Sequence, residues 1–187
     1  MFSMMKNCLS KCVMAVVCFS IISLSCIYAD IQWPQVRIDA NGNQIAIWDT
    51  EDVYTRFIQV STKPLNGDWS APTTISTPNV YSYYPFIEMN KRGDCLIAWL
   101  VIDPLWGITA VVGSTKAHDS STWSAPQMLS SGYELVDQEL SLTINDAGEV
   151  GVGWKTYNLY TGQNYGVCRL GSIESGWDAE NQISDLY

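Results

Sequence analysis

A strand-and-turn pattern opens the first of three repeated units and reads Pro34-Gln35-Val36-Arg37-Ile38-Asp39-Ala40-Asn41-Gly42, followed at a short distance by Trp48. The pattern returns twice, and its matching positions are Pro85, Asn90, Gly93 and Trp99 in the second copy and Leu140, Asn145, Gly148 and Trp154 in the third. A repeat of this length is typical of folds that stack one structural unit on the next.

A second landmark follows in each unit. Trp69-Ser70-Ala71-Pro72 and Trp123-Ser124-Ala125-Pro126 are identical, and Trp177-Asp178-Ala179 is a partial third copy. The three tryptophans are evenly spaced, and each unit closes on an aliphatic residue and a serine: Ile75-Ser76, Leu129-Ser130 and Ile183-Ser184. So many shared offsets indicate true internal repeats.

Each unit contains four apolar stretches separated by turn residues, which is the strand content of a propeller blade. The first stretch alternates, as at Val36 and Ile38, so that one set of side chains shares a face. An Asx residue and a glycine then predict a hairpin turn. The second stretch (44–48, 95–99 and 150–154) is apolar throughout, so we expect both of its faces to be covered.

The third stretch covers 54–61, 108–114 and 165–170, and the fourth is predicted to begin at the recurring tryptophan. No stretch keeps an apolar stripe at helical spacing. The sequence therefore predicts an all-β fold, a partial β-propeller of three four-stranded antiparallel blades at about 32–78, 83–132 and 138–187. A β-sandwich is the second choice, because it does not demand a near-identical repeat.

Residues 1–29 have the pattern of a signal peptide. Lys6 and Lys11 precede an apolar run at 13–24, no acid occurs before Asp30, and Ala29 offers a small residue for cleavage. We therefore expect an exported protein that is secreted, periplasmic or at the cell surface. Residues 30–187 should form one domain, with no stable membrane span after the signal peptide is cleaved. Lipidation at Cys26 is the alternative for this segment, although Ser23 departs from a lipoprotein box.

Charge and cysteine content narrow the functional classes. Two of the 10 Lys and Arg residues lie in the first 29, so 8 bases remain against 19 acids, a net charge of −11. Such a chain repels nucleic acid. Cys95 and Cys168 are the two cysteines outside the first 29 residues, and since they belong to different strands of different repeats we expect two separate buried thiols.

The repeat pattern of Asx, glycine and tryptophan followed by Trp-Ser-Ala-Pro resembles that of bacterial sialidase-like propellers. The resemblance covers residues 30–187 and implies a propeller fold. The chain departs from that family because no segment matches the Asp-box Ser-x-Asp-x-Gly-x-Thr-Trp. Sialidase chemistry would also need three clustered arginines, whereas Arg92 falls in a turn and Arg56 and Arg169 in third strands.

Three blades do not close a ring, since propellers have about four to eight. Bare end blades would expose large apolar surfaces. Three explanations stay open: two chains pair as a homodimer, the chain is part of a longer propeller, or another partner shields an open stack.

Other catalytic and metal-binding groups are sparse. His118, the single histidine, lies in a polar turn, so a serine or cysteine triad has no base. Carboxylates that remain available for a glycosidase pair are Asp49, Glu51, Asp52, Asp103 and Asp137. Asn145, Asp146 and Glu149 are interpreted as a plain turn rather than a calcium site, and we predict no metal and no cofactor.

Aromatic residues that do not repeat gather on the rim formed by the second-to-third loops and the blade connections. They are Tyr81, Tyr83, Tyr84, Trp106, Tyr133, Tyr157 and Tyr160. Rings beside carboxylates can hold a glycan or a peptide, although they can equally serve as packing. The first hypothesis is therefore a non-catalytic exported binding module; the alternative is part of a sialidase-like or glycosidase-like propeller enzyme.

Overall fold

The computed structural model describes residues 30–102, 109–130, 135–157 and 160–186, which form three four-stranded antiparallel sheets. The first sheet contains β1 (Asp30–Ile38), β2 (Gln44–Glu51), β3 (Arg56–Lys63) and β4 (Thr73–Thr74). The second contains β5 (Tyr81–Met89), β6 (Cys95–Ile102), β7 (Thr109–Lys116) and β8 (Gln127–Met128). The third contains β9 (Leu135–Ile144), β10 (Glu149–Tyr157), β11 (Asn164–Ser172) and β12 (Gly176–Leu186).

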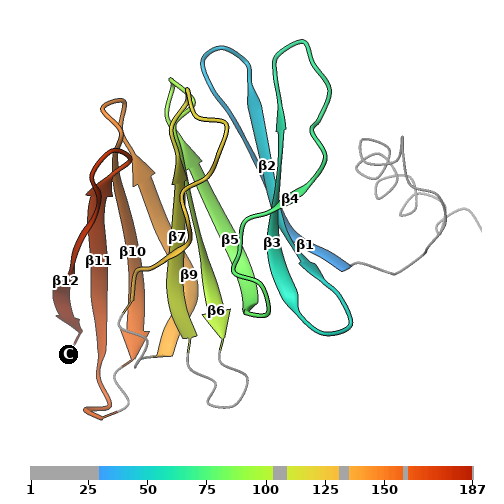
Figure 1. Ribbon diagram of the computed structural model, residues 1–187. Helices are drawn as coiled ribbons and strands as arrows, with labels where there is room; N and C mark the ends of the chain where they lie inside the picture. The colour runs from blue at the N-terminus through green and yellow to red at the C-terminus, as the bar shows by residue number, and fades with distance from the viewer. Residues whose placement is uncertain (1–29, 103–108, 131–134, 158–159, 187) are drawn as a thin grey trace, which may run out of the picture.

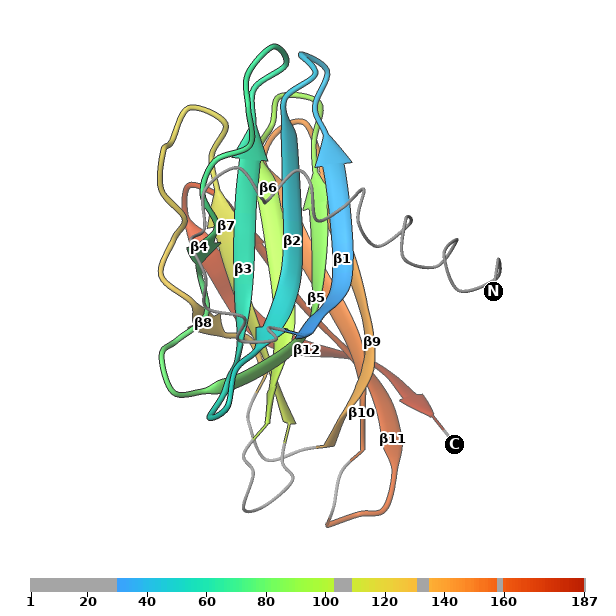
Figure 2. The ribbon, with the colours of Figure 1, turned by 90° about the vertical axis from the view of Figure 1, so that its right-hand side faces the viewer.

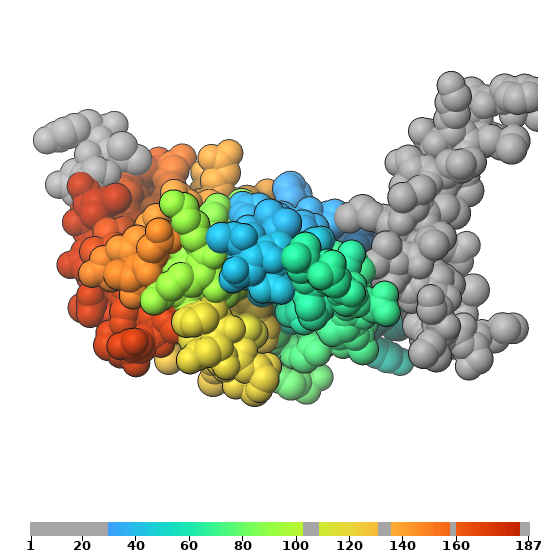
Figure 3. Space-filling model, turned by 90° about the horizontal axis from the view of Figure 1, so that it is seen from above, coloured from blue at the N-terminus to red at the C-terminus, as the bar shows by residue number. Residues whose placement is uncertain are grey.

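The three sheets, called blades 1, 2 and 3 below, stand side by side in chain order (Figures 1 and 3). Inside each blade every strand pairs with the next one along the chain, and no strand crosses to another sheet. This is the predicted all-β architecture of a partial propeller. The signal peptide predicted at 1–29 lies outside the described residues.

The turn after each first strand forms because an Asx side chain caps it. The Asp39 carboxylate accepts hydrogen bonds from the Asn41 and Asn43 amides at 2.8 Å, and Asn90 and Asn145 repeat this geometry. The following glycines adopt positive φ angles of 83°, 94° and 85° at Gly42, Gly93 and Gly148. A side chain there would be strained, which explains why glycine recurs in all three units.

An irregularity interrupts each first strand at the same height. In β1 the pairing with β2 shifts between Gln32 and Gln35, and in β5 it shifts between Tyr83 and Phe86. Trp33 and Tyr84 occupy these bulges with φ angles of 52° and 48°, each directly before a proline. A bulge bends its strand and redirects the bulged side chain, so both aromatic residues are re-aimed at equivalent points.

Two apolar clusters fill the spaces between blades. Blade 1 contributes a trailing face of Ile45, Ile47, Ile58, Val60 and Ile75, which packs on a leading face of blade 2 made by Ile87, Cys95, Ile97, Trp99 and Val112. Blade 2 in turn presents the trailing face Leu96, Ala98, Leu100, Val111 and Leu129 to Leu140, Val150, Val152, Trp154 and Val167 of blade 3. Each leading face thus packs on the preceding blade.

The second strands are largely buried in all three blades. Cys95 through Leu100 of β6 are all at most 1% exposed, so the middle blade confirms the expectation of burial on both faces. In the predicted stretches of the other two blades, 44–48 and 150–154, every residue is buried or half-buried. The exposed residues Glu149, Lys155 and Tyr157 of β10 lie outside the predicted stretch, at the two ends of the strand.

The predicted start of the fourth strands is wrong in blades 1 and 2. The Trp-Ser-Ala-Pro segments instead pair irregularly with the third strand: the Ser70 amide donates to the Thr62 carbonyl and the Ser124 amide to the Thr115 carbonyl, both at 2.8 Å. Pro72 and Pro126 lack an amide hydrogen and end this pairing, so β4 and β8 follow with two residues each. Glu180 replaces the proline in the third copy, and β12 runs unbroken for 11 residues.

Candidate functional site

The predicted aromatic residues are only partly brought together. Tyr81, Tyr83 and Tyr84 lie inside strand β5, which corrects the prediction that they belong to the connection between blades. Tyr157 is the last residue of β10 rather than a loop residue, and Tyr160 follows in a turn with 88% of its surface exposed. Trp106, Tyr133 and Asp103 lie outside the described residues.

The three tyrosines of β5 form one group with a tryptophan from blade 1. The Tyr81 and Tyr83 rings stack with centroids 6.2 Å apart, and Tyr83 lies 6.1 Å from Tyr84. The Trp33 indole meets the Tyr84 ring edge to face at 5.0 Å, and half of the Trp33 surface is exposed. The two bulges thus bring rings from adjacent blades into contact.

Charged groups from the ends of β2 and β3 adjoin these rings. The Arg56 guanidinium lies 5.2 Å from the centre of the Tyr83 ring, within cation–π range, and forms an ion pair with Glu51. A second contact of 4.0 Å joins Arg56 Nη1 to Asp49 Oδ2. We call Trp33, Asp49, Glu51, Arg56, Tyr81, Tyr83 and Tyr84 the rim cluster.

Asp49 is the most unusual member of the rim cluster. Its side chain is fully buried, its Oδ2 accepts the Tyr84 amide at 3.3 Å, and its Oδ1 has no hydrogen-bond partner among the described residues. Burial raises the pKa of Asp49, the Arg56 charge and the Tyr84 amide oppose this, and the acids Asp30 and Glu51 add to it. A buried carboxyl with a raised pKa retains its proton to higher pH and can act as an acid.

Sequence analysis named Asp49 only as one carboxylate among several and missed Trp33 altogether. The repeat alignment carries a signal for both. The positions equivalent to Asp49 hold Leu100 and Lys155, so an acid there breaks the repeat. Trp33 precedes Pro34 as Tyr84 precedes Pro85, which marks the two equivalent bulges.

Arg56 lies in the third strand of blade 1, as predicted. The sequence does not predict its contact with the next blade, where its guanidinium, at the first residue of β3, lies over the Tyr83 ring. Arg169 has a structural role instead, because its guanidinium donates to the carbonyls of Met128 and Leu129 and so joins blade 3 to blade 2.

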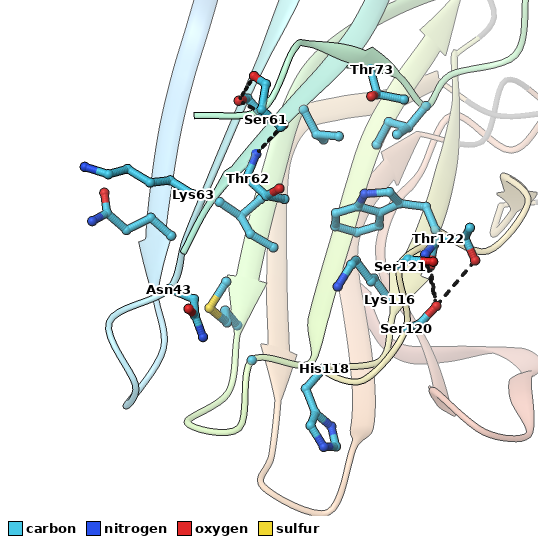
Figure 4. A pocket seen from close by; sticks show the side chains of 18 of the residues that line it. Asn43, Ser61, Thr62, Lys63, Thr73, Lys116, His118, Ser120, Ser121 and Thr122 are labelled. Atoms are coloured by element: carbon cyan, nitrogen blue, oxygen red, sulfur yellow. Dashed lines mark hydrogen bonds between the residues drawn. The ribbon is translucent and has the colours of Figure 1, made fainter. Parts of the chain in front are cut away.

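A second hollow lies at the opposite rim, between the outer parts of blades 1 and 2 (Figure 4). This cavity of about 920 Å³ is lined by polar side chains around the Trp123 indole, among them Lys63, Lys116 and His118. It opens beside the two-residue strands β4 and β8, which leave the outer edges of these blades short. His118, predicted to be a solvated turn residue, is 45% exposed but also bonds Asp94 through its ring Nδ1 at 2.8 Å.

Metal ligands do not gather in the part of the chain that the structure describes: no three or more His, Cys, Asp and Glu side chains form a group that could hold an ion. Within the same residues, no helix has the length and apolar content to cross a membrane. Cys95 and Cys168 are both free thiols, as expected, but only Cys95 is buried, whereas Cys168 is half-buried.

Comparison with known proteins gives a fold and no family. No protein-family model matches the chain, and no curated protein matches it either. Among solved structures, an endo-arabinase from Bacteroides thetaiotaomicron is similar with a TM-score of 0.54 and 13% identity, over 90% of this chain and 66% of that one. An α-L-arabinanase from Penicillium chrysogenum, solved with arabinobiose, has a TM-score of 0.53 and 17% identity over 81% and 49%.

A polysaccharide lyase, Uly1, is similar with a TM-score of 0.62 and 8% identity, over 87% of this chain and 42% of that one. This chain therefore spans between 42% and 66% of the length of these three enzymes. The two arabinan-degrading enzymes are five-bladed propellers. At such identities the likeness concerns the fold, and it shows that the three sheets are arranged like consecutive blades of a β-propeller.

Proposed function

We propose that this chain belongs to a glycosidase-like propeller that holds a saccharide on the rim cluster, with Asp49 as the acid of the site. One observation carries the proposal: a buried carboxyl with an unpaired oxygen and a raised pKa accepts the backbone amide of Tyr84, whose ring contacts the exposed Trp33 indole. Nothing in the inter-blade packing requires an acid there, because Leu100 serves at the equivalent position of blade 2.

The other members of the rim cluster suit a sugar ligand. Exposed aromatic rings stack on the apolar faces of pyranose and furanose rings, and a few fixed polar groups then orient the hydroxyls. Burial raises the pKa of Tyr83, so its phenol stays protonated and can donate a hydrogen bond. The similarity to arabinan-degrading enzymes makes α-L-arabino-oligosaccharides the first ligands to test.

A non-catalytic binding module is the second candidate, and the burial of Asp49 favours it. With no exposed surface on its side chain, Asp49 does not touch solvent in this arrangement. The guanidinium of Arg56 is also engaged, by Glu51 and by the Tyr83 ring. A site in this state can bind a sugar through Trp33 and Tyr84 without cleaving it.

The experiment measures saccharide binding by calorimetry and turnover of aryl glycosides and arabino-oligosaccharides on the same preparations. Trp33→Ala should weaken binding about tenfold, or about 1.4 kcal/mol, since it removes one stacking ring. Asp49→Asn should keep binding within about threefold while removing turnover, because the amide has no acidic proton to give. Tyr160→Ala is the matched control, an exposed aromatic outside the rim cluster.

Three results distinguish the candidates. Turnover that is lost in Asp49→Asn supports the glycosidase-like site. Binding without turnover, weakened by Trp33→Ala and not by Tyr160→Ala, supports the binding module. No measurable binding to any saccharide, or binding that Trp33→Ala leaves unchanged, contradicts the rim cluster as a sugar site.

A further inference from the structure

The outer surface of blade 1 repeats a surface that the other two blades bury. Ile87 of β5 is 1% exposed and packs on blade 1, and Leu142 and Ile144 of β9 pack on blade 2 in the same way. Their equivalents in β1 are Val36 and Ile38, which are 45% and 62% exposed. Blade 1 therefore presents a leading face with no described blade in front of it.

The direction of these side chains follows from the alternation of β1. Arg37 faces blade 2, because its guanidinium pairs with Glu88 at 3.0 Å, and Gln35 donates to the Pro85 carbonyl at 2.9 Å. Val36 and Ile38 alternate with these residues and so point the other way. Figure 2 looks onto β1, β2 and β3, and no described strand lies in front of them.

Blade 3 has the opposite end face, on which Gly151, Gly153 and Lys155 stand at the positions of Leu96, Ala98 and Leu100 in blade 2. Ile75 closes blade 1 and is 8% exposed against blade 2, and Leu129 closes blade 2 and is fully buried against blade 3. The third member of this set, Ile183, is 64% exposed, and Leu170, farther along the neighbouring strand β11, is 51% exposed. Blade 3 thus ends on a trailing face with no described blade behind it.

We propose that two copies of this chain close head to tail into one ring, in which the trailing face of blade 3 in each copy packs on the leading face of blade 1 in its partner. The contact continues an interface that the chain already forms twice, between blades 1 and 2 and between blades 2 and 3. One chain supplies both unmatched faces, so a second copy satisfies both at once. Two sets of three blades fall within the range of about four to eight that closes a propeller.

The second copy would also complete the surroundings of Trp33. Between blades 1 and 2, the bulged Tyr84 donates its backbone amide to Asp49. At the junction of two copies, the residue equivalent to Asp49 is Lys155 of the partner subunit. A lysine beside an indole is a favourable cation–π pair, so the half-exposed Trp33 becomes part of a site shared by two copies.

The negative charge of the chain makes the proposed pairing of two copies depend on salt concentration. Each chain has a formal net charge of −9, and two such chains repel each other at long range. Salt screens that repulsion and strengthens apolar contact. The paired state should therefore become tighter as sodium chloride is raised, which is the opposite of an assembly held by ion pairs.

The test is the mass of the purified chain in light scattering and sedimentation, measured without saccharide so that it is independent of the proposed function. We expect twice the 20.9 kDa of one chain, reduced by whatever segment is removed from the N-terminus. A single-chain mass at every concentration and salt level would overturn the proposal. So would polymers that grow with concentration, because the ring would then not close.

Two variants locate the interface. Ile38→Arg and Ile183→Arg each place a charge on one end face, and since both side chains are exposed in the single chain, each variant should melt like wild-type protein diluted to single chains. Each should reduce the mass to one chain. Met128→Arg, at a similarly exposed residue on the outer strand β8, is the control and should leave the pair intact.

Mixing the two variants tests the head-to-tail geometry. An equimolar mixture contains one undamaged junction, between the normal leading face of Ile183→Arg and the normal trailing face of Ile38→Arg, so a two-chain mass should return. A mixture that stays at single-chain mass would contradict head-to-tail pairing. If one copy instead binds a different protein, and Ile38→Arg abolishes that binding, another partner covers this face. That result would overturn the proposal that a second copy does.

Discussion

At the residue scale, Asp94 shows how a single carboxylate fastens two turns of blade 2. It is 2% exposed and accepts hydrogen bonds from the Asn90 amide group at 2.7 Å, from the His118 backbone at 2.8 Å and from the Arg92 guanidinium. Burial opposes its ionisation, but these hydrogen bonds prevail and hold the pKa of Asp94 well below its usual value. The loop that carries His118 is thereby tied to the turn at 90–94.

Asp94→Ala should lower the free energy of unfolding by about 3 kcal/mol near neutral pH, because it leaves several donors without a partner. The folded pKa is below the unfolded value of 3.8, so the contribution of Asp94 is fully present above that pH and is lost as pH falls toward the folded pKa. Urea unfolding of both proteins at a series of pH values measures the difference.

Asp146→Ala is the control for this prediction. Asp146 lies in the equivalent turn of blade 3 with 61% of its side chain exposed, and its contact with Lys91 is long, at 4.0 Å. We expect the free energy of unfolding to change by no more than about 0.5 kcal/mol. An equal loss in both variants would mean that the hydrogen bonds of Asp94 are not what stabilises the turn.

At the element scale, β7 shows why some strand positions admit no side chain. A Cβ added at Gly113 would lie 2.8 Å from Leu129 Cδ1 and 3.3 Å from the Trp177 ring, which belongs to the next blade. Gly153 on β10 is different, since its nearest neighbour would be 3.7 Å away, an ordinary contact distance. The close approach at Gly113 reflects a trailing face that is covered by blade 3.

Gly113→Ala should therefore destabilise the fold by about 1–3 kcal/mol through overpacking between blades 2 and 3. Gly153→Ala on the second strand of blade 3 should be neutral or stabilise by about 0.5 kcal/mol, because alanine restricts the unfolded chain. Thermal unfolding of the two variants beside the wild type checks this. A Gly113→Ala protein as stable as the wild type would show that the two blades separate without cost.

The same elements show what the sequence could predict. Strand number, the Asx-Gly turns and the buried Trp48, Trp99 and Trp154 follow from repeated spacing, because local turn chemistry and periodic burial leave a direct trace in the residues. The predicted start of β4 was wrong because Pro72 was interpreted as part of the strand. In the structure β4 begins only after this proline, at Thr73. Local sequence patterns do not predict how many residues of an irregular segment run beside a strand before regular pairing begins.

The rim cluster was only half predicted, for a related reason. Tyr81, Tyr83 and Tyr84 stand out as aromatic residues that do not repeat, but the contact between Tyr84 and Trp33 depends on two bulges and on the spacing of two sheets. Asp49 gains its raised pKa from burial between blades. Such tertiary effects act between residues far apart in the chain, and no single stretch of sequence displays them.

At the scale of the whole molecule, position in the stack should govern local stability. The backbone of β6 is hydrogen-bonded on both sides and its blade is covered on both faces, whereas blades 1 and 3 each have a described blade on one face only. Hydrogen-exchange mass spectrometry should find the β6 amides the slowest to exchange. Slower exchange in β2 or β10 at single-chain concentration would contradict this order.

Strictly consecutive strand pairing also has a kinetic consequence. Every hydrogen-bonded neighbour is the next strand along the chain, so each sheet can assemble by closing short hairpin loops, without waiting for distant segments. Topologies rich in such local contacts fold faster than those that join remote strands. A blade can therefore organise itself while the following one is still being synthesised, with the tight Asx-Gly turns as starting points.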